Sequence, residues 1–458
     1  MFNFRLLQFV MVLASLLLFS GPVLSQATTT EDAPQTTETQ ATEETGDESD
    51  LARRIEAGGE ITLEAGEYEF DSLSIRSNTK LIGAGSEETL IRFSGSGLSV
   101  KDTEIEISGI SFIHDGSVGA NVAMFENSLV TLSDCAFSGA RIVNAETDQD
   151  VGAGAFFLRV EGEITDCVFA DNQTGIVVGR GSILPFEGIE ITNNLEDGLL
   201  AVANAYVVLE WSLVSGNGIH GVTAFNDSYL RLSRNTVEKN GGSGMFLGDN
   251  ASAVAIGTLF NQNVEVGLLI NGTGRLWVDN SRANQNNIGF GLNGEAQAFF
   301  QRTRAEQNTL SGYFGVAQID VEMTNAFASQ NGENGFAFDG EARAYLRNNS
   351  SEDNGLNGFA LMGNASAELL YNLAANNDTS GFFVIDDARV NMTENLSEIN
   401  GIHGILVAHR AQIELRANQL ISNQSYGLFL TEDESISLQE KDTVYDGNVE
   451  GETNNLEE

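Results

Sequence analysis

Short apolar runs recur along this chain at a fixed interval, and each run directly follows a glycine. Gly198 precedes Leu-Leu-Ala-Val, and Gly244 precedes Met-Phe-Leu. About eight residues later, apolar and polar residues alternate, as from Tyr229 to Leu232, which is typical of a strand with one buried face. A third short strand is predicted around the apolar residues Val214, Val237, Phe260, Ala305 and Ala374.

The interval itself is marked by thirteen glycines: Gly154, Gly175, Gly198, Gly221, Gly244, Gly267, Gly289, Gly312, Gly335, Gly358, Gly381, Gly404 and Gly427. From Gly175 onward every spacing is 23 residues except one of 22, and the first spacing is 21. A fixed period of about 20–30 residues is typical of a solenoid. Three strands in 23 residues leave no room for a helix. The sequence therefore predicts an all-β, single-stranded parallel β-helix with 23-residue coils, about 15 coils and roughly 70 Å long.

Polar columns support this prediction. Four residues before the glycine lies an asparagine column, whose members are Asn194, Asn217, Asn240, Asn263, Asn308, Asn331, Asn354, Asn377, Asn400 and Asn423. A second column, nine residues before the glycine, contains Asn235, Asn280, Asn349, Asn372, Asn395 and Asn418. Stacked amides can bond to one another along the axis, and we expect the glycine to supply a positive φ.

An aromatic column is expected inside the core. The first inward residue after the glycine is aromatic in five successive coils, at Phe290, Tyr313, Phe336, Phe359 and Phe382. Such residues can stack on one another from coil to coil.

With these features the chain resembles the right-handed parallel β-helix superfamily, the pectate-lyase-like fold. The segments 59–68 (GEITLEAGEY) and 78–85 (NTKLIGAG) are similar to the first coil of many members. The resemblance covers roughly residues 50–440 and implies a right-handed solenoid. It leaves the activity open, since lyases, hydrolases, epimerases and non-catalytic surface proteins share this fold.

The two ends of the chain differ from the repeats. Arg5, the apolar run from Phe9 to Phe19, and Val23-Leu24-Ser25 predict a secretory signal over residues 1–25. Residues 26–49 are rich in Thr and Glu and predict a disordered acidic tether, and residues 441–458 a similar tail. The solenoid is expected over 50–440, with a short capping helix in which Leu51 and Ile55 share a face. The expected location is secreted, periplasmic or the cell surface, with no membrane span after cleavage.

The charge limits the partners. The chain has 23 Lys and Arg against 65 Asp and Glu, a net charge of −42, which argues against nucleic acid as a partner. No cofactor is predicted. An acidic surface is compatible with calcium, but the chain has no run of alternating aspartates and no Gly-rich calcium-binding nonapeptide.

The two cysteines occupy matching positions, Cys135 in Ser-Asp-Cys-Ala-Phe and Cys167 in Thr-Asp-Cys-Val-Phe. They should lie on neighbouring coils, with the extra residues looping out near Asn144 to Asp150. A disulfide between them and two free thiols are both open, because an oxidising compartment favours the bond while parallel neighbouring strands do not present ideal geometry.

One constellation suggests catalysis. Glu196 and Asp197 precede Gly198, and His220 precedes Gly221 one coil later. This order resembles the acidic pair and later His-Gly of polygalacturonase-like hydrolases, in which a carboxylic acid protonates the leaving oxygen and others activate water. Two departures weaken the resemblance: Asn172-Gln173-Thr174 stands where that family has another aspartate, and its Arg-x-Lys pair is missing. His403 repeats the His-Gly pattern with no acid beside it.

The expected outward positions of the post-glycine strand are largely apolar, at Leu200, Thr223, Phe246, Leu269, Phe314, Phe383, Leu406 and Phe429. A catalytic groove for an anionic sugar would need charged residues there instead. We expect this column to be covered by a loop or a partner, or to serve as an interaction patch if bare.

A second candidate site is a strip of outward residues on the alternating strand. It contains Arg275, Trp277, Asp279, Phe299, Asp320, Glu322, Arg343, Tyr345, Arg347, Glu368 and Arg389. Aromatic rings stack on sugars and arginines bind carboxylates or sulfates, so Trp277, Phe299 and Tyr345 would hold a glycan and Arg343 and Arg347 would select acidic sugars. The alternative is ordinary pairing between coils, such as Asp320 with Arg343.

The sequence thus predicts an exported, non-catalytic β-helix protein with a binding or scaffolding role, toward a glycan or a protein, at the cell envelope or exterior. The alternative is an enzyme acting on acidic glycans, either a polygalacturonase-like glycoside hydrolase, a lyase or an epimerase.

Overall fold

The computed structural model describes residues 48–142, 151–431 and 435–454. The chain divides into two units, Met1–Thr45 and Gly46–Glu458, and the described residues belong to the second. The predicted signal, nearly all of the predicted tether and the predicted loop at Asn144 to Asp150 lie outside the described residues.

Three parallel sheets make up the second unit. The first, which we call the glycine-side sheet, contains β6 (Ala123–Glu126), β8 (Ala153–Leu158), β11 (Thr174–Gly179), β14 (Leu199–Ala201), β17 (Val222–Ala224), β20 (Met245–Asp249), β23 (Val266–Gly272), β26 (Ile288–Gly294), β29 (Tyr313–Gly315), β32 (Phe336–Phe338), β35 (Phe359–Leu361), β38 (Phe382–Val384), β41 (Ile405–Val407), β44 (Tyr426–Leu430) and β47 (Gly451–Thr453).

The second, the long sheet, contains β1 (Gly59–Thr62), β3 (Thr79–Ile82), β9 (Glu161–Thr165), β12 (Ile183–Glu187), β15 (Tyr206–Glu210), β18 (Tyr229–Ser233), β21 (Ser252–Ile256), β24 (Arg275–Asp279), β27 (Gln297–Gln301), β30 (Asp320–Thr324), β33 (Arg343–Arg347), β36 (Ser366–Leu370), β39 (Arg389–Thr393), β42 (Gln412–Arg416) and β45 (Ser437–Lys441).

The third, the short sheet, contains β10 (Val168–Ala170), β13 (Glu190–Thr192), β16 (Leu213–Ser215), β19 (Thr236–Glu238), β22 (Leu259–Asn261), β25 (Arg282–Asn284), β28 (Arg304–Glu306), β31 (Phe327–Ser329), β34 (Ser350–Glu352), β37 (Leu373–Ala375), β40 (Leu396–Glu398), β43 (Gln419–Ile421) and β46 (Val444–Asp446).

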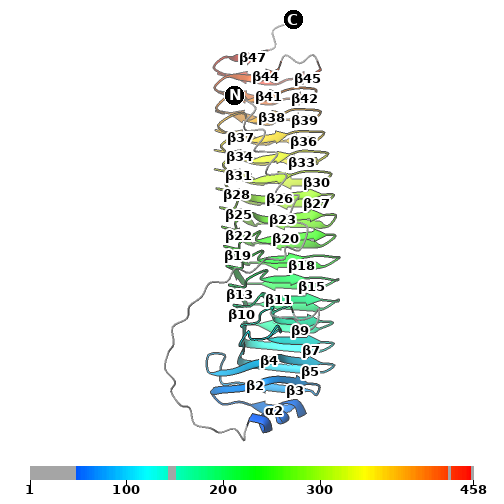
Figure 1. Cartoon of the computed structure of the whole chain (residues 1–458). Helices are drawn as coiled ribbons and strands as arrows, with labels where there is room; N and C mark the ends of the chain where they lie inside the picture. The colour runs from blue at the N-terminus through cyan, green and yellow to red at the C-terminus, as the bar shows by residue number, and fades with distance from the viewer. Residues whose placement is uncertain (1–47, 143–150, 432–434, 455–458) are drawn as a thin grey trace. The chain divides into compact units, whose positions relative to one another are not determined.

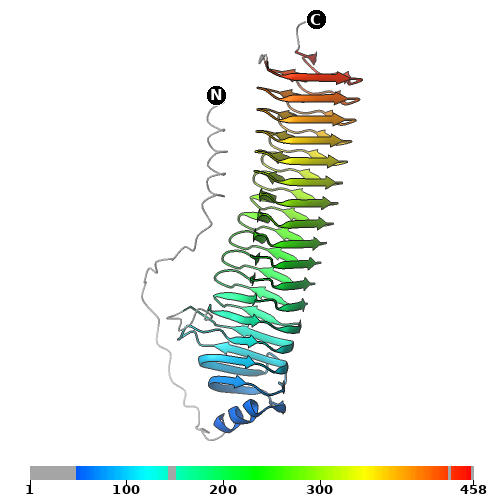
Figure 2. The ribbon, with the colours of Figure 1, turned by 90° about the vertical axis from the view of Figure 1, so that its right-hand side faces the viewer.

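Four longer strands serve two sheets each. β2 (Gly66–Ile75) and β4 (Thr89–Lys101) run from the short into the glycine-side sheet, and β5 (Glu104–His114) and β7 (Leu129–Ser138) run from the long into the short sheet. Each sheet therefore has 17 segments, and the described residues form 17 coils that follow one another in chain order (Figures 1 and 2). This confirms the predicted parallel β-helix, with a coil number close to the expected 15.

The first asparagine column is a continuous buried ladder, as predicted. The Asn194 side-chain amide donates to Asn217 Oδ1 at 2.9 Å, and Asn217 donates to Asn240 Oδ1 at 3.0 Å. Each Oδ1 also accepts a backbone N–H from the preceding coil, such as that of Asn194 at 3.2 Å. Buried amides cost free energy unless they are fully bonded, so this ladder both satisfies the turns and fixes the register.

The coil of 22 residues shifts the second column by one position. Asn349, Asn372, Asn395 and Asn418 form the predicted ladder, with amide bonds of 3.0 Å. Asn280 lies nine residues before Gly289, so the sequence assigns it to this column. In the structure Asn280 is exposed with φ 47°, and Ser281 occupies the buried position. The prediction for Asn280 is therefore wrong, because the missing residue falls between this turn and Gly289.

The recurring glycines are needed for space and not for a positive φ, which corrects the sequence-based expectation. Gly221 has an ordinary φ, but a Cβ there would lie 2.6 Å from the Gly244 carbonyl oxygen and 2.8 Å from Asn240 Nδ2. Positive φ values occur instead in the turns after the long strands, for example at Arg234 (58°) and Tyr371 (59°). The glycine thus lets successive coils approach each other.

Aromatic rings stack inside the core as predicted. Phe290, Tyr313, Phe336, Phe359 and Phe382 are fully buried, with centroids 4.7–5.1 Å apart from coil to coil. A second stack, not predicted, joins Phe93, Phe112, Phe137 and Phe169 in the short sheet.

The ends of the solenoid extend beyond the expected bounds. The helix α2 (Glu48–Ala57) begins two residues inside the predicted tether and packs Leu51, Ala52 and the buried Ile55 on the core. At the other end, β46 and β47 lie within the predicted disordered tail. They form because Asn448 continues the asparagine ladder, accepting from Asn423 at 2.9 Å, and Tyr445 packs on the core. Within the described part of the chain, no helix is long and apolar enough to cross a membrane.

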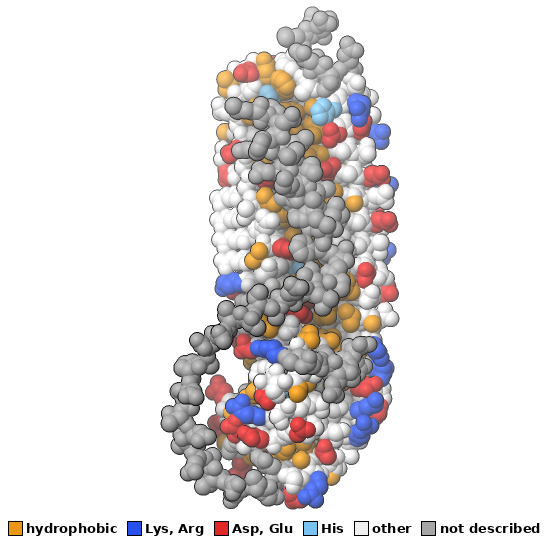
Figure 3. All heavy atoms as spheres, in the orientation of Figure 1, with side chains coloured by type: hydrophobic (Ala, Val, Ile, Leu, Met, Phe, Trp, Pro, Cys, Tyr) orange, Lys and Arg blue, Asp and Glu red, His pale blue; other side chains and the backbone are white. Residues whose placement is uncertain are grey.

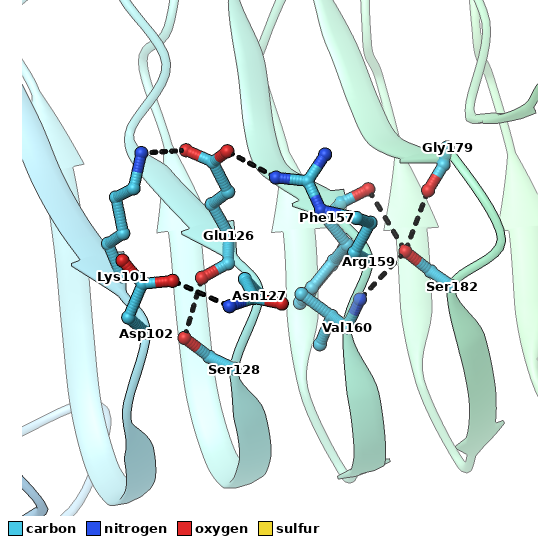
Figure 4. A network of polar contacts seen from close by, with 10 residues as sticks. All are labelled: Lys101, Asp102, Glu126, Asn127, Ser128, Phe157, Arg159, Val160, Gly179 and Ser182. Atoms are coloured by element: carbon cyan, nitrogen blue, oxygen red, sulfur yellow. Dashed lines mark hydrogen bonds and ion pairs between the residues drawn. The ribbon is translucent and has the colours of Figure 1, made fainter.

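The first coils precede the asparagine ladder and are joined by other polar contacts (Figure 4). Glu126 lies between two cations, 2.9 Å from Lys101 Nζ and 2.5 Å from Arg159 Nη2. The hydrogen bond from Lys101 is the largest cause that lowers the pKa of Glu126. In the next coils, Ser182 Oγ donates to the Gly179 carbonyl at 2.7 Å and accepts from the Val160 N–H at 3.1 Å.

The two cysteines lie opposite each other on neighbouring coils, as their matching sequences predict. β7 and β10 pair Ala136 with Val168, which places Cys135 beside Cys167. Both are buried and free, so no disulfide joins them in this structure. The side-chain contact with Cys135 and burial both raise the pKa of the Cys167 thiol.

Candidate functional site

The long sheet places the predicted aromatic residues in one outward column. Trp277 pairs with Phe299, and Tyr345 lies two coils further at the same position, beyond Glu322. Trp277 and Phe299 are 48% and 42% exposed, and their rings stack with centroids 5.9 Å apart. The alternation along each strand sends the intervening residues, such as Leu276 and Ala298, into the core.

A shallow groove of about 630 Å³ crosses this face from β27 to β39. We call it the long-sheet groove. Phe299 and Tyr345 are the aromatic residues that line it. Its charged lining residues are Asp320, Glu322, Arg343, Glu368 and Arg389. The sequence identified these residues but not the hollow that they surround, since its depth depends on the conformations of the lining side chains.

The charges of the groove change one expectation. Three carboxylates face two guanidiniums, and Arg343 lies 3.6 Å from Asp320, which is the pairing between coils that the alternative interpretation predicts. Arg275, Trp277 and Arg347 are not among the lining residues. The groove itself is therefore not basic, and selection of acidic sugars by Arg343 and Arg347 has no support in its geometry. Acidic and basic side chains follow each other along the right-hand margin of Figure 3, where the long sheet runs.

The other predicted constellation lies where the chain enters the glycine-side sheet. Asp197 Oδ1 accepts the backbone N–H of His220 at 3.0 Å, and His220 Nδ1 accepts the backbone N–H of Ser243 at 2.9 Å. Glu196 Oε1 accepts from the Gln173 side-chain amide at 2.9 Å. Each of these side chains therefore bonds to the next or preceding coil.

Two of these groups have shifted pKa values. Burial raises the pKa of Asp197 to about 6, with a smaller contribution from the negative charge of Glu196, and the hydrogen bond from His220 opposes the shift. The Thr223 hydroxyl also lies near Asp197 and lowers its pKa, although its geometry is not that of a hydrogen bond. Burial lowers the pKa of His220, so the ring is neutral at pH 7.

His403 provides a comparison within the same chain. Its Nδ1 accepts the backbone N–H of Tyr426 at 3.4 Å, and its ring stacks on Phe429 at 4.4 Å. His220 stacks on Phe246 in the same way at 5.1 Å. Because His403 has this arrangement with Ser380 at the position that corresponds to Asp197, the contacts of His220 do not by themselves indicate catalysis.

Comparison with known families is decisive for the fold. The sequence matches the family described as the right handed beta helix region over residues 127–283, 226–338 and 315–442, which together cover more than half of the chain. The chain belongs to the right-handed β-helix family. This confirms the predicted hand and the pectate-lyase-like solenoid. No curated protein matches the sequence.

Solved structures with a similar fold include three proteins of different titles. One is a double mutant of the periplasmic alginate epimerase AlgG, with 11% identity, coverage of 87% of this chain and 89% of that chain, and a TM-score of 0.41. Pectate lyase Pel9A has 16% identity, coverage of 62% of this chain and 73% of that chain, and a TM-score of 0.40. The Dettilon tailspike protein has 13% identity, coverage of 76% of this chain and 62% of that chain, and a TM-score of 0.42. These similarities concern the fold alone.

The chemistry open to this β-helix protein differs between its two surfaces. At Asp197, the neighbouring charge is the negative Glu196, and Ser243 offers His220 its backbone N–H and not its hydroxyl. No group of three or more His, Cys, Asp or Glu side chains in the described ranges could hold a metal ion.

Proposed function

We propose that this protein is an exported, non-catalytic member of the β-helix family that holds a glycan chain in the long-sheet groove, at the cell envelope or exterior. The observation that carries the proposal is the register of Trp277, Phe299 and Tyr345 along one outward column, two of them inside a groove of about 630 Å³. The strand spacing puts the second and third rings about 10 Å apart, which suits alternate sugars of a chain laid along the axis. The predicted secretory signal supports export.

The groove favours a glycan of low charge. Its three carboxylates and two guanidiniums are suited to hydrogen bonds with sugar hydroxyls, and stacking on Phe299 and Tyr345 supplies apolar contact. An anionic chain would meet the net charge of −42 at long range, which slows its approach at low salt. We therefore propose a neutral polysaccharide in place of the acidic one that the sequence suggests.

The test is binding of the purified protein to immobilised polysaccharides at two ionic strengths. Neutral probes are β-glucan and galactomannan, and anionic probes are alginate and polygalacturonate. We expect retention on a neutral probe that changes less than twofold between 50 mM and 500 mM salt, because stacking and neutral hydrogen bonds are weakly screened. Retention only on the anionic probes, or on none, would contradict the proposal.

The same samples test the enzymatic alternative. Reducing-sugar and unsaturated-product assays on all four probes should give no turnover. Turnover that Asp197→Asn abolishes would show that the protein is an enzyme, and the groove would then be a secondary feature.

A further inference from the structure

A second pair of stacked aromatic residues lies on the long sheet outside the groove. Tyr206 and Tyr229 are at the first outward position of β15 and β18 and pair in register. Their ring centroids are 5.2 Å apart with an angle of 17° between the planes, and Tyr206 is 40% exposed. Ile183, their neighbour on β12, is also exposed, so the pair is the centre of an apolar surface.

Further apolar side chains lie between this surface and the groove, one outward position further along the strands. Tyr229 itself pairs with Ser252. Val254, the half-buried middle residue of the same strand, pairs with Trp277, which stacks on Phe299. Every coil from β15 to β27 therefore presents an apolar or aromatic side chain to solvent. Tyr206 and Tyr345 are six coils apart, or about 29 Å along the axis.

The charge along this face is balanced, unlike that of the chain as a whole. On the outward positions from β15 to β39 there are five acids and five arginines. The acids are Glu210, Asp279, Asp320, Glu322 and Glu368, and the arginines are Arg231, Arg275, Arg343, Arg347 and Arg389. A face of zero formal charge on a chain of −42 is suited to an uncharged, hydroxyl-rich partner.

An ion pair lies on the same two strands as the tyrosines: Arg231 Nη1 on β18 donates to Glu210 Oε1 on β15 at 2.5 Å. The remaining guanidinium N–H groups and carboxylate lone pairs of this pair can bond to sugar hydroxyls, as the charged lining of the groove can. The tyrosine pair and this ion pair thus repeat the chemistry of the groove.

We infer that Tyr206, Tyr229 and the Arg231–Glu210 pair form a second sugar subsite, so that the ligand is an internal stretch of a long glycan lying along the axis over at least six coils. The inference rests on the proposed function of the groove. One ring of a sugar chain is about as long as one strand spacing, so the two subsites together require about six sugar residues.

The test is calorimetric titration with oligosaccharides of three, six and nine residues, made from the neutral polysaccharide that the protein retains. We expect the affinity to rise from the trimer to the hexamer and to change little beyond it. Tyr206→Ala with Tyr229→Ala should weaken hexamer binding roughly tenfold and leave trimer binding unchanged, because the trimer occupies the groove alone.

Control variants separate binding from folding. Tyr206→Phe with Tyr229→Phe keeps the rings and should keep the hexamer affinity within about twofold. Tyr371, 48% exposed in the turn after β36, is an aromatic residue outside the strip, and Tyr371→Ala should change nothing. Tyr206→Ala alone, at the more exposed ring, gives the same direction of change if the double variant is unstable.

The outcomes distinguish this inference from the proposed function. Unchanged hexamer affinity in the double tyrosine variant, with trimer binding intact, would overturn the second subsite and leave the groove in place. Failure of the unaltered protein to bind either oligosaccharide would overturn both.

Discussion

The turns that lead into the glycine-side sheet and the outward face of the long sheet both carry charged and aromatic residues, but these residues make different contacts in the two regions. At Asp197, His220 and His403, each polar side chain accepts a backbone N–H of the next coil, and each imidazole stacks on a phenylalanine. On the strip, Trp277 and Phe299 stack on each other but remain exposed. The contrast shows that a group of acidic, basic or aromatic side chains indicates function only where those side chains are not already used in contacts between coils.

This difference can be tested first where its expected effect on stability is largest, at Asp197. The pKa of Asp197 is raised to about 6 from an ordinary 3.8, so the folded protein binds this proton more tightly than the unfolded chain does between these values. Stability therefore falls as pH rises through that window, by up to about 3 kcal/mol at pH 7. Asp197→Asn keeps the acceptor for His220 and removes the charge, so urea unfolding should show a more stable variant at pH 7.

At pH 4 the same variant should match the unaltered protein, because Asp197 is then protonated in the folded state. Asp320→Asn, at an exposed carboxylate, is the matched control and should have little effect at either pH. A variant that is less stable than the unaltered protein at pH 7 would mean that the Asp197 charge contributes favourably, contrary to our account.

The two histidines give the next largest effect. His220→Ala removes the acceptor of the buried Ser243 N–H and a stacked ring, which should lower the free energy of unfolding by about 2 kcal/mol. His403→Ala should cost somewhat less, because its hydrogen bond is 3.4 Å long instead of 2.9 Å. Denaturant unfolding measures both.

His409, exposed and paired with Asp386 at 2.8 Å, is the control, and His409→Ala should cost less than 1 kcal/mol. If His220→Ala left stability unchanged while His403→Ala lowered it, the two histidines would not share a structural role, and a special function for His220 would regain support.

A small effect on stability is expected within the groove. Arg343 and Asp320 form an exposed pair at 3.6 Å, so Arg343→Ala should lower the unfolding free energy by less than 1 kcal/mol. Loss of its hydrogen bonds to sugar hydroxyls should weaken glycan binding a few-fold. A loss of several kcal/mol in thermal or chemical unfolding would place Arg343 in the structural framework instead.

Much of the fold follows from the sequence because the period acts on every coil. Most coils repeat the glycine and the asparagine equivalent to Asn194, and five repeat an aromatic residue of the column from Phe290 to Phe382. A strand that is assigned wrongly in one coil can therefore be recognised by comparison with the neighbouring coils. Asn280 was misplaced where one residue is missing from the repeat. The predicted tail was wrong because Asn448 and Tyr445 lie 25 residues from their counterparts Asn423 and Leu420, outside the strict period.

The site was predicted less completely, since alternation identifies which side chains face outward but not how they bond. The Trp277, Phe299 and Tyr345 column required only strand register. The hydrogen bonds of His220, the depth of the groove and the Arg343–Asp320 pairing depend on side-chain conformations that no sequence pattern specifies. The Tyr206 and Tyr229 pair was missed although its 23-residue spacing is visible in the sequence.

Glycan binding along the outward aromatic column can be measured by calorimetric titration of Trp277→Ala with Tyr345→Ala against the retained neutral glycan, beside Tyr371→Ala and the unaltered protein. Each lost ring should remove about 1 kcal/mol, so the double variant should bind roughly 30-fold more weakly, with a thermal midpoint within about 2 °C of the unaltered protein. Unchanged glycan affinity in the folded double variant would show that the aromatic column does not hold the glycan.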